Sequence, residues 1–371
     1  MSPRAARGPV ALAIAFAVAA TARAEVESVF QGGSAGTSRR QDVARSRKLL
    51  ADVLELYPGT TVAVAIEDQL VWSAGFGFSN VKRQLPVRAT TRFRIDRVSE
   101  ALTAAALVRL ADEGKLDLDA PVQRYVPEFP EKSHPLTPRL LAAHLAGFPT
   151  SLPPRSVMRN CSRPEDAVRS FSTVPLSRIP GTRYLHSSPG YVLLSAVVAG
   201  ACGQDFSSCI QEKVLRPAGM TATTLEDPRT PVSNSATPYE RGWFGILAAA
   251  KPVDNSCRWG AGGFVSTAED LARFGIALLR GDIVRRESLP LLFSPQRSSA
   301  GESTGNGLGW RIGVDGAGRR RLVQSGRTVG GRSVVVLVPE ARLSVALLAN
   351  VDGEHLDDHA LKIAALFAEP E

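Results

Sequence analysis

The sequence predicts an α+β protein in which strands from both ends of the chain form one antiparallel sheet, with helices packed on it and a mainly helical lobe inserted. The β-type runs lie near the two ends, at residues 60–81 and 307–350. Between about 96 and 304 the pattern is mainly helical, broken by proline and glycine. Strands that enclose a helical middle in this way are typical of a sheet lobe, here about 41–95 and 305–371, with an inserted lobe, here about 96–304. The 371 residues are enough for one such two-lobed domain.

The first predicted elements are a surface helix and a hairpin. Residues 41–56 carry apolar side chains at helical spacing, and Pro58-Gly59 ends this segment. In the run TTVAVAIEDQLVW, apolar residues alternate with smaller ones before Glu67-Asp68-Gln69, which predicts a turn between two strands.

Two helices of the middle segment have recognisable start signals. Asp96 stands at the expected N-cap of an Ala/Leu-rich helix that ends at Glu113-Gly114. Ser266 and Glu269 form a predicted capping box in STAEDLARFGIALLRG, whose apolar residues share one face.

Strand patterns return near the C-terminus. The runs GLGWRIGV, RRLVQSG and SVVVLVPEARLSVALLAN predict four further strands, two of them joined at Pro339-Glu340. A helix over about Asp358–Phe367 is expected to close the chain.

The N-terminus has the pattern of an export signal. Arg4 and Arg7 precede an apolar run, Pro9–Ala20, which is followed by the small-x-small site Ala22-Arg23-Ala24. We expect residues 1–24 to be a cleaved signal peptide, residues 25–40 to be a disordered leader, and the mature protein to be periplasmic or secreted; an uncleaved anchor is the alternative. The later segments contain no apolar run long enough to cross a membrane.

Charge does not favour nucleic acid as a partner. Removal of residues 1–24 takes away three arginines and no acids, which lowers the formal charge from +8 to +5. Much of the remaining charge is scattered arginine, and the run Arg319-Arg320-Arg321 has the context of an exposed hairpin. A nucleic-acid surface needs a basic stripe with interleaved aromatic residues, so we expect no nucleic-acid partner.

Four cysteines lie beyond the signal segment, which permits two disulfides in an oxidising compartment. Cys202 and Cys209 flank a predicted helix–turn–helix and are the natural pair, which leaves Cys161 and Cys257 by elimination. Free buried thiols are the alternative. No Cys-x-x-Cys spacing supports zinc or thioredoxin-like chemistry.

Six stretches of the chain together resemble the serine β-lactamase and penicillin-binding-protein-like family, which includes class C β-lactamases and D-Ala-D-Ala carboxypeptidases. Among members of this family, these stretches resemble the mitochondrial serine β-lactamase-like proteins most in sequence. The resemblance runs from about Gly59 to Phe367 and implies the two-lobed fold of the family. It is carried by FRIDRVSEALTAAALVRLADEGKLDLDAPVQRYVPEFPEK, LTPRLLAAHLAGFP, PGTRYLHSSPGYVLLSAVVAG, RWGAGGFVSTAEDLARFG, GLGW and VLVPE.

The resemblance fails at the positions that carry the family's chemistry. The family uses a serine nucleophile and a lysine three residues later, on one helix face, where the amine takes the hydroxyl proton. Here Arg97 occupies the serine position and Glu100 the lysine position. An arginine is always protonated and cannot attack a carbonyl group.

Three further motifs are also changed. The family's Tyr-x-Asn triplet corresponds to His186-Ser187-Ser188, and its Lys- or His-x-Gly motif to Gln324-Ser325-Gly326, which keeps only the glycine. A His-Thr-Ser-Gly type turn becomes His144-Leu145-Ala146-Gly147. The resemblance therefore implies a cleft without the family's acyl-enzyme chemistry.

The replacements allow several interpretations. Arg97 and Glu100 can pair as opposite charges at i and i+3, or Arg97 can bind a carboxylate or phosphate at the helix N-terminus. Glu100 with His186 can form a new acid–base pair, with Ser188 or water as nucleophile. His355 and His359 have zinc-like spacing but no third ligand in the pattern, so we expect no metal.

We therefore expect an exported pseudoenzyme that keeps the cleft as a binding or scaffolding surface. The expected binding residues are Arg97, Glu100, His186, Gln324 and Gly326, and the ligand expected by analogy is a peptide or cell-wall fragment. The alternatives are a divergent ester or amide hydrolase with a rearranged site and a structural interaction protein whose cleft is filled. We expect no cofactor, and the sequence predicts no oligomeric state.

Overall fold

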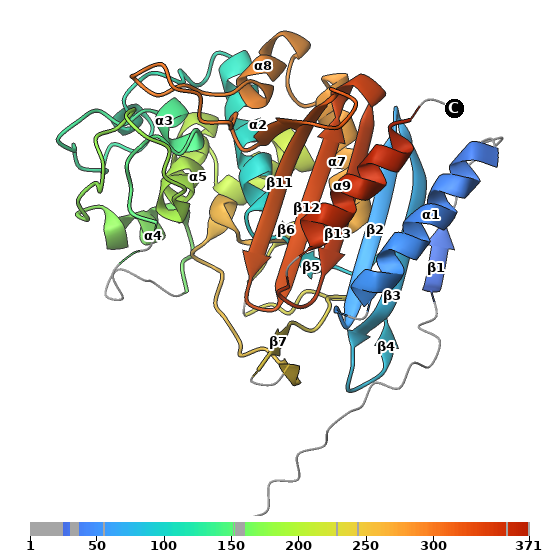
Figure 1. The fold of residues 1–371 in the computed structure, drawn as a ribbon. Coiled ribbons are helices and arrows are strands. Elements are labelled where there is room, and N and C mark those ends of the chain that lie inside the picture. Colours follow the sequence, from blue (N-terminus) through green and yellow to red (C-terminus); the bar gives the residue numbers. More distant parts are fainter. Residues whose placement is uncertain are drawn as a thin grey trace, which may run out of the picture.

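The computed structural model describes residues 25–29, 37–54, 56–150, 152, 160–227, 229–242, 245–353 and 355–369. Its centre is an eight-stranded antiparallel sheet built from both ends of the described chain (Figure 1). In spatial order its strands are β1 (Glu25–Val29), β3 (Gln69–Asn80), β2 (Gly59–Ile66), β13 (Leu343–Ala349), β12 (Gly331–Val338), β11 (Arg320–Thr328) and β10 (Arg311–Val314), and β4 (Leu85–Pro86) pairs with β3.

The two ends of the chain meet at the pairing of β2 with β13. Val62 lies opposite Leu347 and Val64 opposite Val345, and all four side chains are buried. Buried strands of β-branched and aliphatic residues are what a sheet covered on both faces requires. The predicted α+β class with a sheet from both termini is therefore confirmed.

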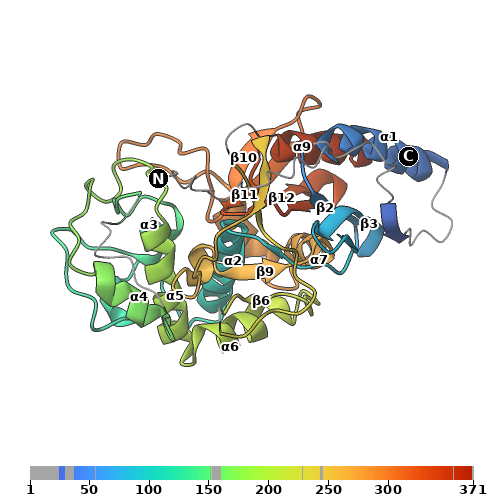
Figure 2. The same cartoon turned by 90° about the horizontal axis from the view of Figure 1, so that it is seen from below.

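Helices cover both faces of the sheet. On one face lie α1 (Thr37–Leu54) and α9 (Leu356–Phe367), which pack against each other (Figures 1 and 2). Their core includes Trp72 stacked on Phe367, with ring centroids 6.3 Å apart. On the other face α7 (Ala268–Arg280) and α2 (Val98–Asp112) join the sheet to a larger core shared with the helical lobe.

The inserted lobe is mainly helical. It contains α3 (Pro138–Ala142), α4 (Pro164–Phe171), α5 (Ser188–Cys202), α6 (Phe206–Ile210) with a π-helical continuation over Gln211–Leu215, and α8 (Leu289–Phe293). Two small sheets lie outside the main sheet. One contains β5 (Phe93–Arg94), β9 (Phe264–Ser266) and β6 (Thr224–Leu225), and the other contains β7 (Tyr239–Arg241) and β8 (Leu247–Ala249), whose Tyr239 bridges to Val351 and packs in the core under α9. In Figure 2 this lobe lies beside the sheet, on the side away from α1.

One helix of the inserted segment belongs to the sheet. The sequence interpretation placed residues 268–280 in the helical lobe, but α7 packs on β2 and β13. Gly275 permits this contact, because a Cβ there would overlap the side chains of Ser344 and Leu337. The lobe boundaries drawn from sequence order are therefore wrong at α7.

The N-terminal boundaries also differ from the prediction. The predicted signal segment, residues 1–24, lies outside the described residues. Residues 25–40 were expected to be a disordered leader, but Glu25–Val29 form β1, which pairs with β3, and α1 already begins at Thr37. An edge strand with polar residues gives no clear alternation, so its pairing with β3 was invisible in the sequence.

Both predicted helix caps are displaced by one residue. The cap of α7 is Thr267, whose side chain accepts a hydrogen bond from the Asp270 amide, while Ser266 belongs to β9. The N-cap of α2 is Arg97, not Asp96. Asp96 is buried with a left-handed φ of 43°, and its carboxylate accepts from the Arg327 amide and pairs with Arg258 at 2.5 Å. It therefore ties the start of α2 to β11 and to the segment before β9.

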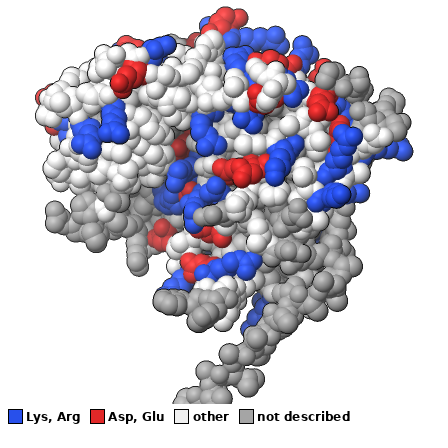
Figure 3. Space-filling model, in the orientation of Figure 1, with Lys and Arg blue, Asp and Glu red and all other residues white. Residues whose placement is uncertain are grey.

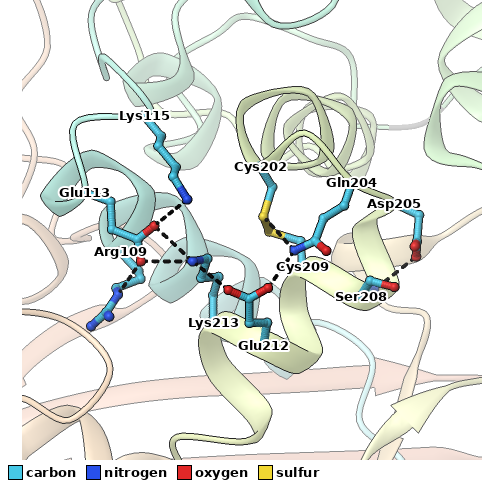
Figure 4. The surroundings of a disulfide bond; sticks show 10 residues. All are labelled: Arg109, Glu113, Lys115, Cys202, Gln204, Asp205, Ser208, Cys209, Glu212 and Lys213. Atoms are coloured by element: carbon cyan, nitrogen blue, oxygen red, sulfur yellow. Dashed lines mark hydrogen bonds and ion pairs between the residues drawn. A yellow bond between two sulfur atoms is a disulfide. The ribbon is translucent and has the colours of Figure 1, made fainter.

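Two disulfides link parts of the inserted lobe, Cys161–Cys257 and Cys202–Cys209, the pairs expected from the sequence. Cys202 ends α5 and Cys209 lies in α6, so this bridge closes a tight corner (Figure 4). Beside it, Lys213 is nearly buried and pairs with Glu113 and Glu212, each at a shortest distance of 2.9–3.0 Å. The corner is thus fixed to the end of α2 by both covalent and ionic contacts.

Charged side chains of both signs are interspersed over the face in Figure 3. The Arg319-Arg320-Arg321 run lies at the predicted hairpin, where Arg319 precedes β11 and the other two arginines begin it. Arg319 pairs with Asp315 and Arg320 with Glu340. Within the described residues, no single helix has the length and apolar character needed to cross a membrane. α5 and the Phe206–Leu215 segment would pass that test only as a pair, and they are bent by 78°.

Candidate active site

A cavity of about 200 Å³ lies between the start of α2, strand β11 and two loops of the inserted lobe. Its walls are mostly polar, with two arginines, two histidines and one carboxylate. The lining residues are Arg97, Glu100, His144, Tyr184, His186, Asn306, Gly307, Gly309, Trp310, Arg311, Val323, Gln324 and Ser325.

Backbone contacts bring the two loops together. The Leu185 amide donates to the His144 carbonyl at 2.9 Å, so His144 and His186 become neighbours although 42 residues separate them. Their ring centroids are 4.4 Å apart. Gly326 on β11 allows the start of α2 to approach closely, because a Cβ there would overlap the carbonyl of Ile95 and lie 2.8 Å from the Arg97 nitrogen.

Glu100 is the centre of the cluster. Its carboxylate is 1% exposed, and it lies 3.2 Å from His186 Nε2, 3.4 Å from His144 Nε2 and 3.3 Å from the Gln324 amide nitrogen. Burial by itself would raise the pKa of Glu100, but the contacts with His144 and His186 outweigh burial and lower the pKa to about 2. Glu100 is therefore an ionised, hydrogen-bonded carboxylate at neutral pH.

His144 is held in one tautomer. The Ser187 amide donates to His144 Nδ1 at 3.3 Å, so the neutral ring carries its proton on Nε2 and points it at Glu100. Burial lowers the pKa of His144, and the neighbouring Glu100 carboxylate opposes this effect. The residue also has a left-handed φ of 56°.

Arg97 does not pair with Glu100, contrary to the simplest interpretation of the sequence. Among the described residues its ion-pair partner is Asp96, at 4.0 Å, and its side chain remains 44% exposed. The reason is geometric: Glu100 points into the protein toward the histidines, whereas Arg97, at the N-cap, lies at the cavity wall. Its guanidinium is therefore accessible to a ligand.

Two of the residues singled out from the sequence lie elsewhere. Ser188 begins α5 and is not among the residues that line the cavity, and Gly326 packs against backbone. The neighbouring Ser187 is the α5 N-cap and donates to the Pro149 carbonyl. The serine that lines the cavity is Ser325.

Sequence reasoning missed four polar residues of the wall: His144, Tyr184, Asn306 and Arg311. His144 was visible as the retained residue of a turn motif, and that was the one available signal. Tyr184 packs edge-on against His144, with ring centroids 5.6 Å apart, and burial raises its pKa to about 12, so it is a neutral hydroxyl. Arg311 adds a second cation to the wall.

This arrangement offers two kinds of chemistry. The guanidinium groups can bind an anion, because arginine presents several fixed donors to a carboxylate or phosphate. The Glu100–His186 contact can orient an imidazole as a proton acceptor. A serine–lysine pair is absent from the position where α2 begins, since that turn carries Arg97 and Glu100.

The fold and the cleft between its two lobes define a β-lactamase-type serine hydrolase scaffold. The family model described as Beta-lactamase matches residues 47–369, and the chain belongs to this family. The family expected from the sequence motifs is therefore confirmed.

Among curated proteins the chain is similar to the serine beta-lactamase-like protein LACTB, mitochondrial, of Homo sapiens, with 27% identity over 84% of this chain and 76% of that protein. It is also similar to Protein flp of Staphylococcus aureus (strain N315), with 23% identity over 81% of this chain and 61% of that protein.

Solved structures share the fold. FmtA from Staphylococcus aureus has a TM-score of 0.77 at 18% identity, covering 94% of both chains. The D-amino acid amidase from Ochrobactrum anthropi SV3, complexed with L-phenylalanine amide, has a TM-score of 0.74 at 22% identity, covering 88% of this chain and 97% of that chain. The octameric penicillin-binding protein homologue from Pyrococcus abyssi has a TM-score of 0.70 at 23% identity, covering 89% of this chain and 76% of that chain.

Proposed function

We propose that this protein is a β-lactamase-family pseudoenzyme that uses the cleft corresponding to the family's active site to bind a carboxylate-bearing ligand. The observation that carries the proposal is the place of Arg97: a permanent cation, 44% exposed, occupies the turn where the family has its nucleophile. A guanidinium group cannot form an acyl-enzyme, but it can hold the anion that such an enzyme would attack.

A second cation supports an anionic ligand. Arg311 lines the same cavity as Arg97. Relatives with this fold include penicillin-binding-protein homologues and an amidase of D-amino acids. The proposed ligand class is therefore a short peptide or cell-wall fragment with a free carboxylate.

The binding experiment compares N-acetyl-D-alanyl-D-alanine with its C-terminal amide by calorimetry. We expect the acid to bind more tightly, and Arg97→Ala to weaken its binding about 10- to 100-fold, because one charge-assisted contact contributes about 1.5–3 kcal/mol. Arg342→Ala is the matched control, since Arg342 is 71% exposed and lies between β12 and β13. Equal binding of acid and amide, or an unchanged affinity in Arg97→Ala, would contradict the proposed ligand class.

The absence of acyl-enzyme chemistry has its own test. Purified protein is incubated with a fluorescent penicillin and with a fluorophosphonate, beside an active member of the family. We expect no stoichiometric labelling of this protein. A covalent adduct on any hydroxyl of the cavity, Ser325 included, would overturn the pseudoenzyme proposal.

A second candidate function is a divergent hydrolase, and the 3.2 Å contact between Glu100 and His186 Nε2 favours it. If Glu100 accepts the Nε2 proton, His186 Nδ1 is left as a base for a water molecule. Ser188, the nucleophile considered from the sequence, lies outside the cavity lining. Hydrolysis of a panel of ester and amide substrates that is lost in both Glu100→Gln and His186→Gln would favour this function over the pseudoenzyme.

We further propose export of the protein to a periplasm or medium. The N-terminal Arg4–Ala24 pattern and the two disulfides support this, because structural disulfides persist in oxidising compartments. Edman sequencing of protein recovered from periplasm and medium should give Glu25 as the first residue. Recovery of an intact N-terminus in the cytoplasm would contradict export.

A further inference from the structure

We propose that Glu100, His144 and His186 form a binding site for one divalent transition-metal ion, with Zn²⁺ as the ion that fits best. The three side chains come from separate elements: α2, the turn after α3 and the loop before α5. This proposal is independent of the carboxylate-binding function, because it concerns the buried end of the cavity and not Arg97.

The distances between the donor atoms suit a zinc ion. The two histidine Nε2 atoms lie 3.2 Å and 3.4 Å from the Glu100 oxygens, and one ligand atom from each residue lies within 4.8 Å of the others. Two ligands at about 2.1 Å from zinc with a tetrahedral angle between them are about 3.4 Å apart. Small side-chain movements are therefore enough to bring all three donors onto one ion.

The donor set matches zinc sites that keep an open position. Two imidazoles and one carboxylate are a known three-ligand set, whose fourth position is taken by water or a ligand. Here that position faces the cavity, because Glu100, His144 and His186 all line it. A metal-bound water or an anionic ligand can therefore complete the coordination.

Charge compensation is the second observation that points to a cation. The Glu100 carboxylate is 1% exposed, and its partners among the described residues are two histidines and an amide, with no lysine or arginine. A buried carboxylate is normally paired with a full positive charge or a metal. The Gln324 amide, which donates to Glu100 Oε2, would orient the carboxylate as an outer-shell partner.

Two features of the site oppose metal binding: the tautomer of His144 and the positive charge of Arg97. His144 carries its Nε2 proton toward Glu100 because the Ser187 amide donates to Nδ1. A metal on Nε2 displaces this proton, which moves to Nδ1 at the expense of the 3.3 Å Ser187 hydrogen bond. In addition, the Arg97 cation at the cavity wall repels a dication. Removing Arg97 should therefore tighten metal binding, the opposite of its effect on a carboxylate ligand.

The test uses full-length mature protein that has been stripped with a chelator and titrated with Zn²⁺ by calorimetry. The stoichiometry is checked by elemental analysis, and Co²⁺ provides the visible absorption of a tetrahedral site. We expect one equivalent to bind, and Glu100→Gln and His186→Gln each to weaken binding by at least about 100-fold. His359→Gln is the matched control, because His355, the exposed N-cap of α9, and the half-buried His359 lie outside the cavity lining. His186 is the safer variant for folding, since its side chain is 26% exposed.

Each outcome distinguishes zinc binding by Glu100, His144 and His186 from zinc binding elsewhere on the protein surface. One equivalent lost in His186→Gln and kept in His359→Gln supports the site, as does an anomalous zinc peak between the three side chains in a crystal. No binding, or binding that survives in His186→Gln, overturns the proposal. Arg97→Ala separates the two proposals: tighter zinc binding with unchanged carboxylate affinity leaves the metal site standing while the proposed ligand class fails.

Discussion

At the scale of single residues, the chemistry of the cleft depends on the directions in which the Arg97 and Glu100 side chains point. Arg97 ends on the cavity wall and Glu100 is buried beneath it, so a spacing that permits an ion pair instead produces two separate features. The buried carboxylate forms hydrogen bonds with two imidazoles, which is an arrangement sensitive to pH.

His144 should make the protein less stable as the pH falls below about 6.5, its ordinary pKa. Its pKa is lowered in the folded state by burial, so the unfolded chain binds a proton first and the free energy of unfolding decreases with falling pH. Urea unfolding at pH 7.5 and 5.5 measures this. In His144→Gln the dependence over this range should become flatter, and an identical slope in both proteins would show that another group is responsible.

Glu100 should affect the stability of the protein at a more acidic pH than His144 does. Its pKa is lowered from 4.5 to about 2, so its contribution is complete above pH 4.5 and is lost as the pH falls toward 2. The loss should be up to about 3 kcal/mol for a shift of this size. Urea denaturation between pH 5 and 2.5 should show this loss of stability in the wild type and not in Glu100→Gln. Equal acid sensitivity of the two proteins would rule out Glu100 as the cause of the loss.

At the scale of elements, the packing depends on how closely α2 and α7 approach the sheet. Gly326 lets the first turn of α2 lie against β11, and Gly275 lets α7 lie against β12 and β13. Asp96 adds a buried carboxylate that joins α2 to β11 and to Arg258. The contacts of Gly326 and Asp96 hold Arg97 and Glu100 in place over the strand that carries Gln324.

Gly275→Ala should destabilise the protein by about 1–3 kcal/mol, because the added methyl group overlaps Ser344 and Leu337 in a packed interface. Gly313→Ala on β10 is the matched control, since a Cβ there meets nothing within 4 Å, and it should change stability by less than about 0.5 kcal/mol. Thermal or urea unfolding of the two variants gives the comparison. Similar stability of both would mean that α7 has room to move.

At the scale of the whole molecule, two disulfides of very different span stabilise the inserted lobe. Cys161–Cys257 joins residues 96 positions apart, and Cys202–Cys209 joins residues 7 apart. In the chain-entropy model a longer closed loop restricts the unfolded chain more.

Loss of the long-range disulfide should therefore cost more. Replacing Cys161 and Cys257 by alanine is expected to reduce stability by about 2 kcal/mol more than replacing Cys202 and Cys209. Equilibrium unfolding of the two double variants under oxidising conditions measures the difference. A larger loss from the Cys202–Cys209 pair would show that the corner around Lys213 contributes more than chain entropy does.

Much of the fold could be predicted because its signals are local. The alternation in β2, the apolar runs of β12 and β13 and the helical face of α7 are read from neighbouring residues, and they indicate the correct elements. The errors lie where tertiary contacts decide: β1 exists through its pairing with β3, and α7 joins the sheet although it lies within the inserted segment.

The sequence by itself determined the family, the α+β class and the replacement of the nucleophile and its lysine by Arg97 and Glu100, because residue identity at a motif position needs no coordinates. Only the tertiary structure decided that these two charges separate and that His144 and His186 meet at Glu100. The physical reason is that a cavity gathers side chains from elements far apart in the chain. Their distances depend on backbone contacts such as Leu185 to His144, which no local pattern records.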